Sequence, residues 1–349
     1  RMYMKDFEAP TVLRFASFEL VRNQWRRYTG LQQLDEGPNQ NADPIETVFQ
    51  VDAVNIEENS SKTPFNYTLP RGIQREQSLG VFNALQNEQS LVMRIDGLDD
   101  NESQAVFKYT ETDMRLYERL QMFVHAEERS DEIEDQLQDD ELNLFIRLGS
   151  DFTQNYYEYE IPLKISRPEV VEGVENSNLD PYRDEVWRAE NQLDFPLDVL
   201  KNLKVARNDA GFDATAVFEQ QYVSDSEGAG GAIHNVKVKG NPNLGFVKVM
   251  MIGVRNPMKG NMPGADNLPS GNVEVWANEL RLTGLNEKGG LAAIARVDMQ
   301  LADLGSVTVA GNYSSIGFGA LDMGVMERSR EQITGYDLAA NIELGKFLP

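Results

Sequence analysis

Hydrophobic and polar residues alternate along most of the chain with a period of two, which is typical of half-buried β-strands. In the segment 89–96, for example, Leu91, Met93 and Ile95 fall on one face of the predicted strand. Further strands are predicted at residues 12–20, 24–28, 47–57, 103–110, 119–126, 142–148, 156–165, 217–222, 232–239, 246–254 and 272–283. Clusters of Gly, Pro, Asn and Asp separate these runs, so the pattern predicts an all-β protein with long loops.

The spacing of the strands predicts how the chain divides into domains. Many short antiparallel strands joined by long loops favour β-sandwiches. We predict two antiparallel, jelly-roll-like β-sandwich domains, the first over residues 1–167 and the second over residues 205–285. An acidic, proline-containing linker with short helical turns is predicted between them, over residues 168–204.

The last segment, residues 286–349, alternates more strictly than the rest of the chain. It contains three amphipathic runs, each close to the ~9–11 residues with which a tilted strand crosses an outer membrane. Two interpretations are open: an ordinary sheet with one face on a soluble core, or the first strands of an outer-membrane β-barrel. Single-chain barrels begin at about eight strands, so three cannot close one. The two interpretations differ in whether Leu338, Ala340, Ile342 and Leu344 pack on this chain's own sandwich.

Composition narrows the possible functions. The chain has 349 residues and a net charge of -23, which argues against binding to nucleic acid or to an anionic membrane surface. It has no cysteine, which excludes disulfides, thiolate zinc sites and a cysteine nucleophile. It starts at Arg1 and stops within a strand-like run, so we expect an internal segment of a longer protein.

Candidate chemistry is scarce, and we expect no enzyme activity, no catalytic residue and no cofactor. The two histidines, His125 and His234, lie in different predicted domains. No GxSxG, HExxH or P-loop motif is present, and nothing identifies which two of the 56 acidic residues would form a glycosidase pair.

One acidic turn is a weak candidate for calcium, although it does not follow the EF-hand pattern. Its carboxylates are Asp96, Asp99, Asp100 and Glu102. The alternative is that these side chains are simply solvated.

Three aromatic residues, Trp25, Tyr156 and Tyr157, are candidates for a protein interface or a ligand platform. Exposed together on one face, they would suit a surface carbohydrate-binding β-sandwich module, which is the alternative function. Strand alternation favours core packing for them instead.

Longer phrases of the sequence resemble the SprA/Sov family. They are PTVLRFA (10–16), NQWRRY (23–28), LQMFVHAE (120–127), LGSDF (148–152), NYYEY (155–159), GNPNL (240–244), IGVRNP (252–257), EVWANELRL (274–282), LADLG (301–305), GFG (317–319) and ERS (327–329). They occur in order over nearly the whole chain, so the resemblance is specific.

The resemblance implies the outer-membrane translocon of the type IX secretion system of Bacteroidota, which is also tied to gliding motility. It implies a very large β-barrel with extramembrane β-domains that passes folded cargo bearing a carboxy-terminal signal domain to the cell surface. The implied partners are the rest of the translocon barrel, a lipid-facing shuttle barrel, a periplasmic plug protein and the secreted cargo.

Overall fold

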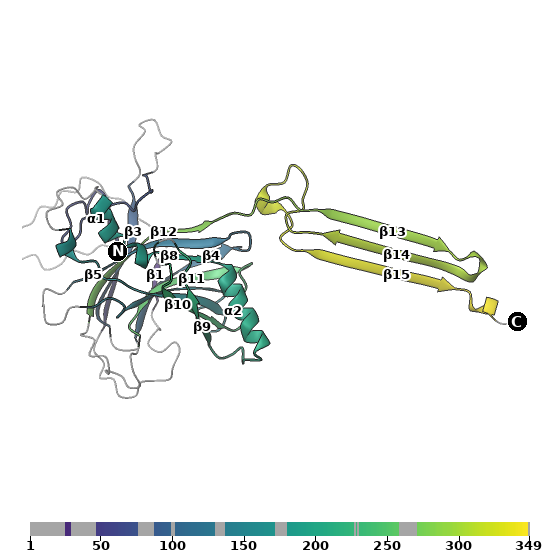
Figure 1. Cartoon of the computed structure of the whole chain (residues 1–349), viewed down its shortest axis with the longest axis horizontal. Coiled ribbons are helices and arrows are strands. Elements are labelled where there is room, and N and C mark those ends of the chain that lie inside the picture. Colours follow the sequence, from purple (N-terminus) through teal and green to yellow (C-terminus); the bar gives the residue numbers. More distant parts are fainter. Residues whose placement is uncertain are drawn as a thin grey trace, which may run out of the picture.

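The computed structural model describes residues 25–28, 47–75, 87–98, 102–129, 137–171, 180–226, 228, 230–257 and 271–347. Within these residues the chain forms two large antiparallel sheets in one body and a separate three-stranded antiparallel sheet, which extends away from that body (Figure 1). The prediction of an all-β protein is confirmed.

The larger sheet of the body has seven strands in the order β1-β4-β11-β6-β7-β10-β9. These strands are β1 (Arg26–Tyr28), β4 (Ser103–Thr112), β6 (Asn143–Gly149), β7 (Tyr156–Pro162), β9 (Phe218–Val223), β10 (Ile233–Lys239) and β11 (Val247–Arg255). The predicted strands 142–148 and 156–165 correspond to β6 and β7, which pair as an antiparallel hairpin. Its turn is fixed by the Asp151 carboxylate, which accepts hydrogen bonds from three successive backbone amides, those of residues 153–155.

The smaller sheet has five strands in the order β2-β3-β12-β5-β8. They are β2 (Val48–Asn55), β3 (Gln89–Leu98), β5 (Arg119–Glu128), β8 (Leu193–Pro196) and β12 (Gly271–Thr283). The four-strand series β3-β12-β5-β8 faces the series β4-β11-β6-β7 of the other sheet, and this is the strand order of a jelly roll.

One hydrophobic core lies between the two sheets. Alternate residues of β5 (Leu120, Met122, Val124) and of β6 (Leu144, Ile146, Leu148) belong to the same buried cluster. The alternation of hydrophobic and polar residues therefore arises from half-buried strands, as the sequence predicted. Every second side chain of each sheet faces the other sheet.

The predicted division into two sandwiches is corrected by the strand order. Strands β10, β11 and β12 come from the predicted second domain, but they pair with β7, β4, β6, β3 and β5 of the predicted first domain. Strand β8 lies within the predicted linker, yet it forms one edge of the smaller sheet. Described residues between 25 and 283 thus build one sandwich, because each sheet takes strands from both halves of the sequence.

Short helices cover parts of this sandwich. Helix α2 (Asp198–Asp209) packs Leu200 and Leu203 into the main core beside β10 and β9, and Gly211 follows it with a φ of 63°, a left-handed conformation that commonly ends helices. Helix α1 (Asp180–Val186) packs Tyr182 and Val186 against the outer face of the smaller sheet. Short 3-10 turns lie at Pro168–Val170, Ala189–Asn191, Ala302–Leu304, Val325–Glu327 and Leu344–Phe347. Among the described helices, none has the length and apolar character required to cross a membrane.

The third sheet follows β12 in the sequence and has the order β13-β14-β15. Its strands are β13 (Ala292–Gln300), β14 (Gly305–Ser314) and β15 (Ile333–Ile342). Figure 1 shows it projecting from the body, with the carboxyl end of the chain at its far tip.

Candidate functional site

The projecting sheet has one apolar face, and the strand register produces it. Val309 of β14 lies opposite Val297 of β13 and Leu338 of β15. Directly paired residues share a face, so the apolar positions of all three strands come together. The face consists of Ala293, Ala295, Val297, Met299, Val307, Val309, Gly311, Tyr313, Thr334, Tyr336, Leu338, Ala340 and Ile342.

This apolar face is open to solvent among the described residues. Tyr336 is 92% exposed, Leu338 68% and Ile342 51%. Ala340 and Leu344 are exposed as well. The four residues chosen to separate the two interpretations of the tail therefore do not pack on this chain's own sandwich. Monomeric soluble proteins rarely leave such a contiguous apolar surface bare, so this face is suited to an apolar environment or to a partner.

The opposite face of the same sheet is polar. Its central residues are Arg296, Asp298 and Thr308, and Asp298 accepts hydrogen bonds from the other two. The sheet therefore has two chemically different sides, which is the arrangement of a strand surface between an apolar and an aqueous phase.

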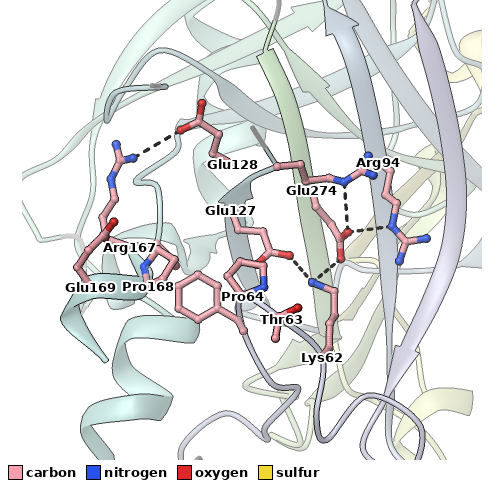
Figure 2. Close-up of a pocket in the computed structure, with 13 residues that line it drawn as sticks. Lys62, Thr63, Pro64, Arg94, Glu127, Glu128, Arg167, Pro168, Glu169 and Glu274 are labelled. Carbon is pink, nitrogen blue, oxygen red and sulfur yellow. Dashed lines mark hydrogen bonds and ion pairs between the residues drawn. The ribbon is translucent and has the colours of Figure 1, made fainter. Parts of the chain in front are cut away.

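A second candidate site is a charged pocket of about 590 Å³ on the outer face of the smaller sheet (Figure 2). Arg94 of β3, Glu274 of β12 and Glu127 of β5 lie side by side on three neighbouring strands. Their sequence neighbours on the inner face belong to the main core, so these charged side chains point outward. The loop containing Lys62, Pro64 and Phe65 and the segment 166–169 complete the walls.

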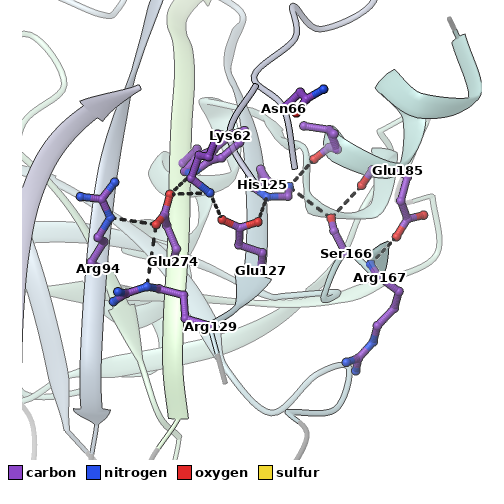
Figure 3. Close-up of polar contacts among 12 residues, drawn as sticks. Lys62, Asn66, Arg94, His125, Glu127, Arg129, Ser166, Arg167, Glu185 and Glu274 are labelled. Carbon is purple, nitrogen blue, oxygen red and sulfur yellow. Dashed lines mark hydrogen bonds and ion pairs between the residues drawn. The ribbon is translucent and has the colours of Figure 1, made fainter. Parts of the chain in front are cut away.

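Two glutamates on adjacent strands would repel each other, and Lys62 lies between them. Its Nζ is 2.5 Å from Oε1 of Glu127 and 3.4 Å from Oε1 of Glu274 (Figure 3). The other oxygen of Glu274 accepts a hydrogen bond of 2.8 Å from Nε of Arg94 and lies 4.0 Å from Nε of Arg129. Burial alone would raise the pKa of Glu274, but hydrogen bonds from Arg94 and Trp276 and the charge of Lys62 outweigh it and lower the pKa.

A buried histidine lies behind the pocket. Nδ1 of His125 is 2.7 Å from the carbonyl oxygen of Val186 and 3.2 Å from Oγ of Ser166. Its Nε2 lies 3.5 Å from Oε2 of Glu127, and both atoms are buried and have no hydrogen-bond partner among the described residues. The contacts that run from Arg94 through Glu274, Lys62 and Glu127 thus continue inward to His125 (Figure 3). Backbone and side-chain contacts hold this histidine in place.

Comparison with protein families decides the identity of the chain. The model of the family SprA_N, described as motility related/secretion protein, matches residues 1–349. The chain belongs to this family. No curated protein matches it. The chain is therefore motility- and secretion-related, in agreement with the resemblance of its sequence phrases to the SprA/Sov family.

The predicted calcium candidates of this SprA-family chain are only partly within the described residues. Asp96 accepts a hydrogen bond of 2.9 Å from Arg129, and Glu102 accepts one of 2.7 Å from Thr47. Asp99 and Asp100 lie outside the described residues. Within the described ranges, no three acidic or histidine side chains come close enough to hold a metal ion, so the calcium site stays a prediction.

The three aromatic candidates do not form an exposed platform. Tyr156 and Tyr157 are consecutive in β7, point to opposite faces and are 0% and 4% exposed. Tyr157 packs in the main core, and Tyr156 stacks on the guanidinium of Arg147 at 3.7 Å. Trp25 is half-buried, with Nζ of Lys108 4.7 Å from its ring centre. Core packing, the simpler alternative, describes Tyr157, whereas Tyr156 is buried on the outer face of its sheet against Arg147. The carbohydrate-binding alternative gains no support from either tyrosine.

The charged pocket was not predicted from the sequence. The sequence pattern that could have indicated the pocket is a charged residue at an outward strand position. Arg94, Glu127 and Glu274 each occupy such a position in a strand whose inward positions are apolar. Such positions are usually solvated, and only the covering loop around Lys62 makes them a pocket. His125 and His234 are both buried, in different sheets, so they do not share a site.

Proposed function

We propose that this chain is a non-enzymatic structural segment of the type IX secretion translocon, in which β13, β14 and β15 contribute to the wall of an outer-membrane β-barrel. Membership of a motility- and secretion-related family supports the general role. The observation that carries the specific role is the projecting sheet, whose apolar face is exposed and whose other face is polar.

The dimensions of the sheet support a place in the membrane. Its strands have 9, 10 and 10 residues, which fits the ~9–11 residues of a membrane-spanning strand. Both edge strands, β13 and β15, have no further strand beside them in the described residues, so additional strands of a barrel can pair with them.

The jelly-roll body would then stand outside the membrane, as a domain next to the pore through which folded cargo passes. The net charge of -23 suits a passive role in this conduit, because acidic surfaces repel like-charged surfaces of passing cargo and so reduce adhesion. In this proposal the partners are the remaining barrel, a lipid-facing shuttle barrel, a periplasmic plug protein and cargo with a carboxy-terminal signal domain.

Two neighbouring substitutions in β15 test the proposal in the bacterium that makes this protein. Leu338→Arg places a charge on the apolar face, whereas Ala339→Arg places the same charge on the polar face one residue away. A cation on the lipid side of a barrel costs about 2–4 kcal/mol near the bilayer midplane. We expect Leu338→Arg to reduce outer-membrane assembly, secretion and gliding, and Ala339→Arg to leave them nearly unchanged.

The measurements are immunoblotting of outer-membrane fractions and assay of secreted cargo in the culture medium. Equal effects of the two substitutions, or full secretion with Leu338→Arg, would contradict a membrane position for this sheet.

A further inference from the structure

The charged pocket on the outer face of the smaller sheet is unrelated to the projecting sheet and has no part in the proposed barrel. Its volume of about 590 Å³ lies within the range of small-molecule sites, about 300–1,000 Å³. Unlike most such sites, its walls are charged. Four cationic side chains (Lys62, Arg94, Arg129, Arg167) and four carboxylates (Glu127, Glu128, Glu169, Glu274) line it.

The cationic and the acidic side chains of the pocket differ in how far they are exposed to solvent. The side chains of Glu127 and Glu274 are 1% and 3% exposed, whereas those of Arg94, Arg129 and Arg167 are 24%, 37% and 26% exposed. Glu127 and Glu274 hold the cationic groups in place from behind, and the side chain of Glu128 is only 10% exposed. Of the four carboxylates only Glu169 is exposed, so a molecule entering the pocket meets three partly exposed guanidinium groups and one exposed carboxylate. This layering favours an anionic ligand.

Arg94 and Arg129 also have N–H groups that are not used in hydrogen bonds within the described residues. Arg94 uses Nε for Glu274 and Nη1 for Asp52, and Arg129 uses Nη1 for Asp96. Among the described residues, Nη2 of Arg94 and Nη2 of Arg129 donate no hydrogen bond. Both guanidinium groups approach the same oxygen of Glu274, at 2.8 and 4.0 Å, so they converge on one side of the pocket. Two converging planar donors match the geometry of a carboxylate.

The opposite wall supplies a third guanidinium. Arg167 donates to the carbonyl oxygen of Leu137 and lies 3.7 Å from Glu128, and Pro64 and Phe65 also line the pocket. Figure 2 shows Arg167 and Arg94 on opposite sides of Pro64. A ligand with a short apolar body and carboxylates at its ends fits this arrangement. A phosphate fits less well, because it carries its charge on a single group and has no apolar body, so it matches one wall and not both.

We propose that this pocket is a binding site for carboxylate-bearing ligands, held by Arg94 and Arg129 on one wall and by Arg167 on the other. The carboxylates belong either to a free dicarboxylic acid or to the acidic side chains of a peptide. This inference does not rest on the role of the chain in secretion, so either can fail without the other.

Isothermal titration calorimetry on the purified 349-residue chain tests the site. The probes are succinate, an acetylated and amidated Gly-Glu-Glu-Gly peptide, inorganic phosphate and uncharged succinamide. We expect saturable binding of succinate or of the peptide, and the stronger of the two identifies the source of the carboxylate. We expect no binding of succinamide, because it lacks the charge.

Two pocket variants and one matched control complete the experiment. Arg129→Gln and Arg167→Gln each remove one guanidinium that is partly exposed, so neither leaves a fully buried charge unpaired. Each is expected to weaken binding about tenfold or more, the usual value of a charged hydrogen bond. Arg71→Gln removes an exposed ion pair with Asp184 outside the pocket and is expected to leave affinity unchanged.

The proposal is overturned if neither carboxylate probe binds saturably, or if phosphate binds and both carboxylate probes do not. It is also overturned if the two pocket variants bind as tightly as the Arg71→Gln control. Far-UV circular dichroism checks that each variant is folded, and two independent pocket variants keep the result decisive if one of them is not.

Discussion

At the scale of single residues, the outer faces of the sandwich sheets hold charged and polar groups that are nevertheless buried. Glu158 of β7 is 0% exposed and contacts Arg147, Arg255 and Lys237 from three other strands. Burial would raise the pKa of its carboxyl, but the three cations outweigh burial and hold the pKa well below its ordinary value. Such a cluster stabilises only as a complete set, since removal of one partner leaves a buried charge uncompensated.

His234 gives the residue-scale prediction. It is 1% exposed, its Nδ1 lies 2.7 Å from the hydroxyl of Tyr159, and desolvation lowers its pKa from 6.5 to about 4. The folded state therefore keeps His234 neutral, whereas the unfolded chain takes up a proton below pH 6.5. The contribution of this residue to stability is complete above pH 6.5 and is lost progressively as the pH falls from 6.5 towards 4.

Substitution of His234 by Asn removes this titration and keeps a polar atom near Tyr159. We expect the free energy of unfolding of the wild type to fall between pH 7 and pH 4 by up to about 3 kcal/mol more than that of His234→Asn. Urea unfolding at several pH values measures the difference, and carboxylate titration affects both proteins alike. Parallel pH profiles would show that His234 is not the responsible group.

Strand alternation predicted which residues face inward but not what happens to those facing outward. Glu127, Glu158 and Glu274 stand at outward positions, where solvation is the normal expectation. They are buried because distant parts of the chain, such as Lys62 and Lys237, come to lie beside them. A sequence pattern is local, so it contains no information about these partners.

At the scale of elements, the strand positions were predicted well and their pairing was not. The predicted strands 217–222, 232–239, 246–254 and 272–283 correspond closely to β9, β10, β11 and β12. Alternation and turn residues are properties of each segment alone, which explains this success. Pairing depends on which strands meet, and in this jelly roll β3 pairs with β12 across about half of the chain. The two-domain prediction failed for that reason.

Two glycines in strand centres give the element-scale prediction. A Cβ on Gly253 of β11 would lie 2.4 Å from the Phe145 ring and 2.7 Å from Cβ of Ala105, whereas a Cβ on Gly311 of β14 would have no atom nearer than 3.9 Å. We expect Gly253→Ala to lower the free energy of unfolding by about 1–3 kcal/mol because the core there is overpacked.

The matched variant Gly311→Ala is expected to be neutral or slightly stabilising, since glycine costs entropy in a strand that has room for a side chain. Urea unfolding followed by circular dichroism measures both changes. Equal stability of the two variants would contradict the close packing of β11 between β4 and β6.

At the scale of the whole molecule, a closed sandwich and an open, amphipathic sheet are parts of one chain (Figure 1). The sandwich buries its hydrophobic residues between two sheets, whereas the projecting sheet exposes large apolar side chains such as Leu338 and Ile342. The alternation of residues 286–349 left two interpretations of the tail open, and it was the resemblance to the SprA/Sov family that favoured the membrane interpretation. The separation of the two parts became visible only in the structure.

The exposed apolar face predicts how the purified chain behaves in water. We expect the wild type to self-associate in plain buffer and to become monomeric when a mild detergent covers the face. The variant Leu338→Arg is expected to associate less, and Ala339→Arg to behave as the wild type. Light scattering coupled to size-exclusion chromatography measures the mass of each. A wild type that is monomeric without detergent would contradict this expectation.

The strand order of the sandwich also bears on how the chain acquires its structure. Strand β11 lies between β4 and β6 in the larger sheet, and β12 lies between β3 and β5 in the smaller sheet. The last two sandwich strands in the sequence are therefore inner strands, one in each sheet. A growing chain that ends before Val247 holds four long strands with unpaired edges, and such edges promote aggregation. Non-local pairing of this kind is also slow. We therefore expect the nascent protein to need protection from aggregation until its final sandwich strands have been synthesised.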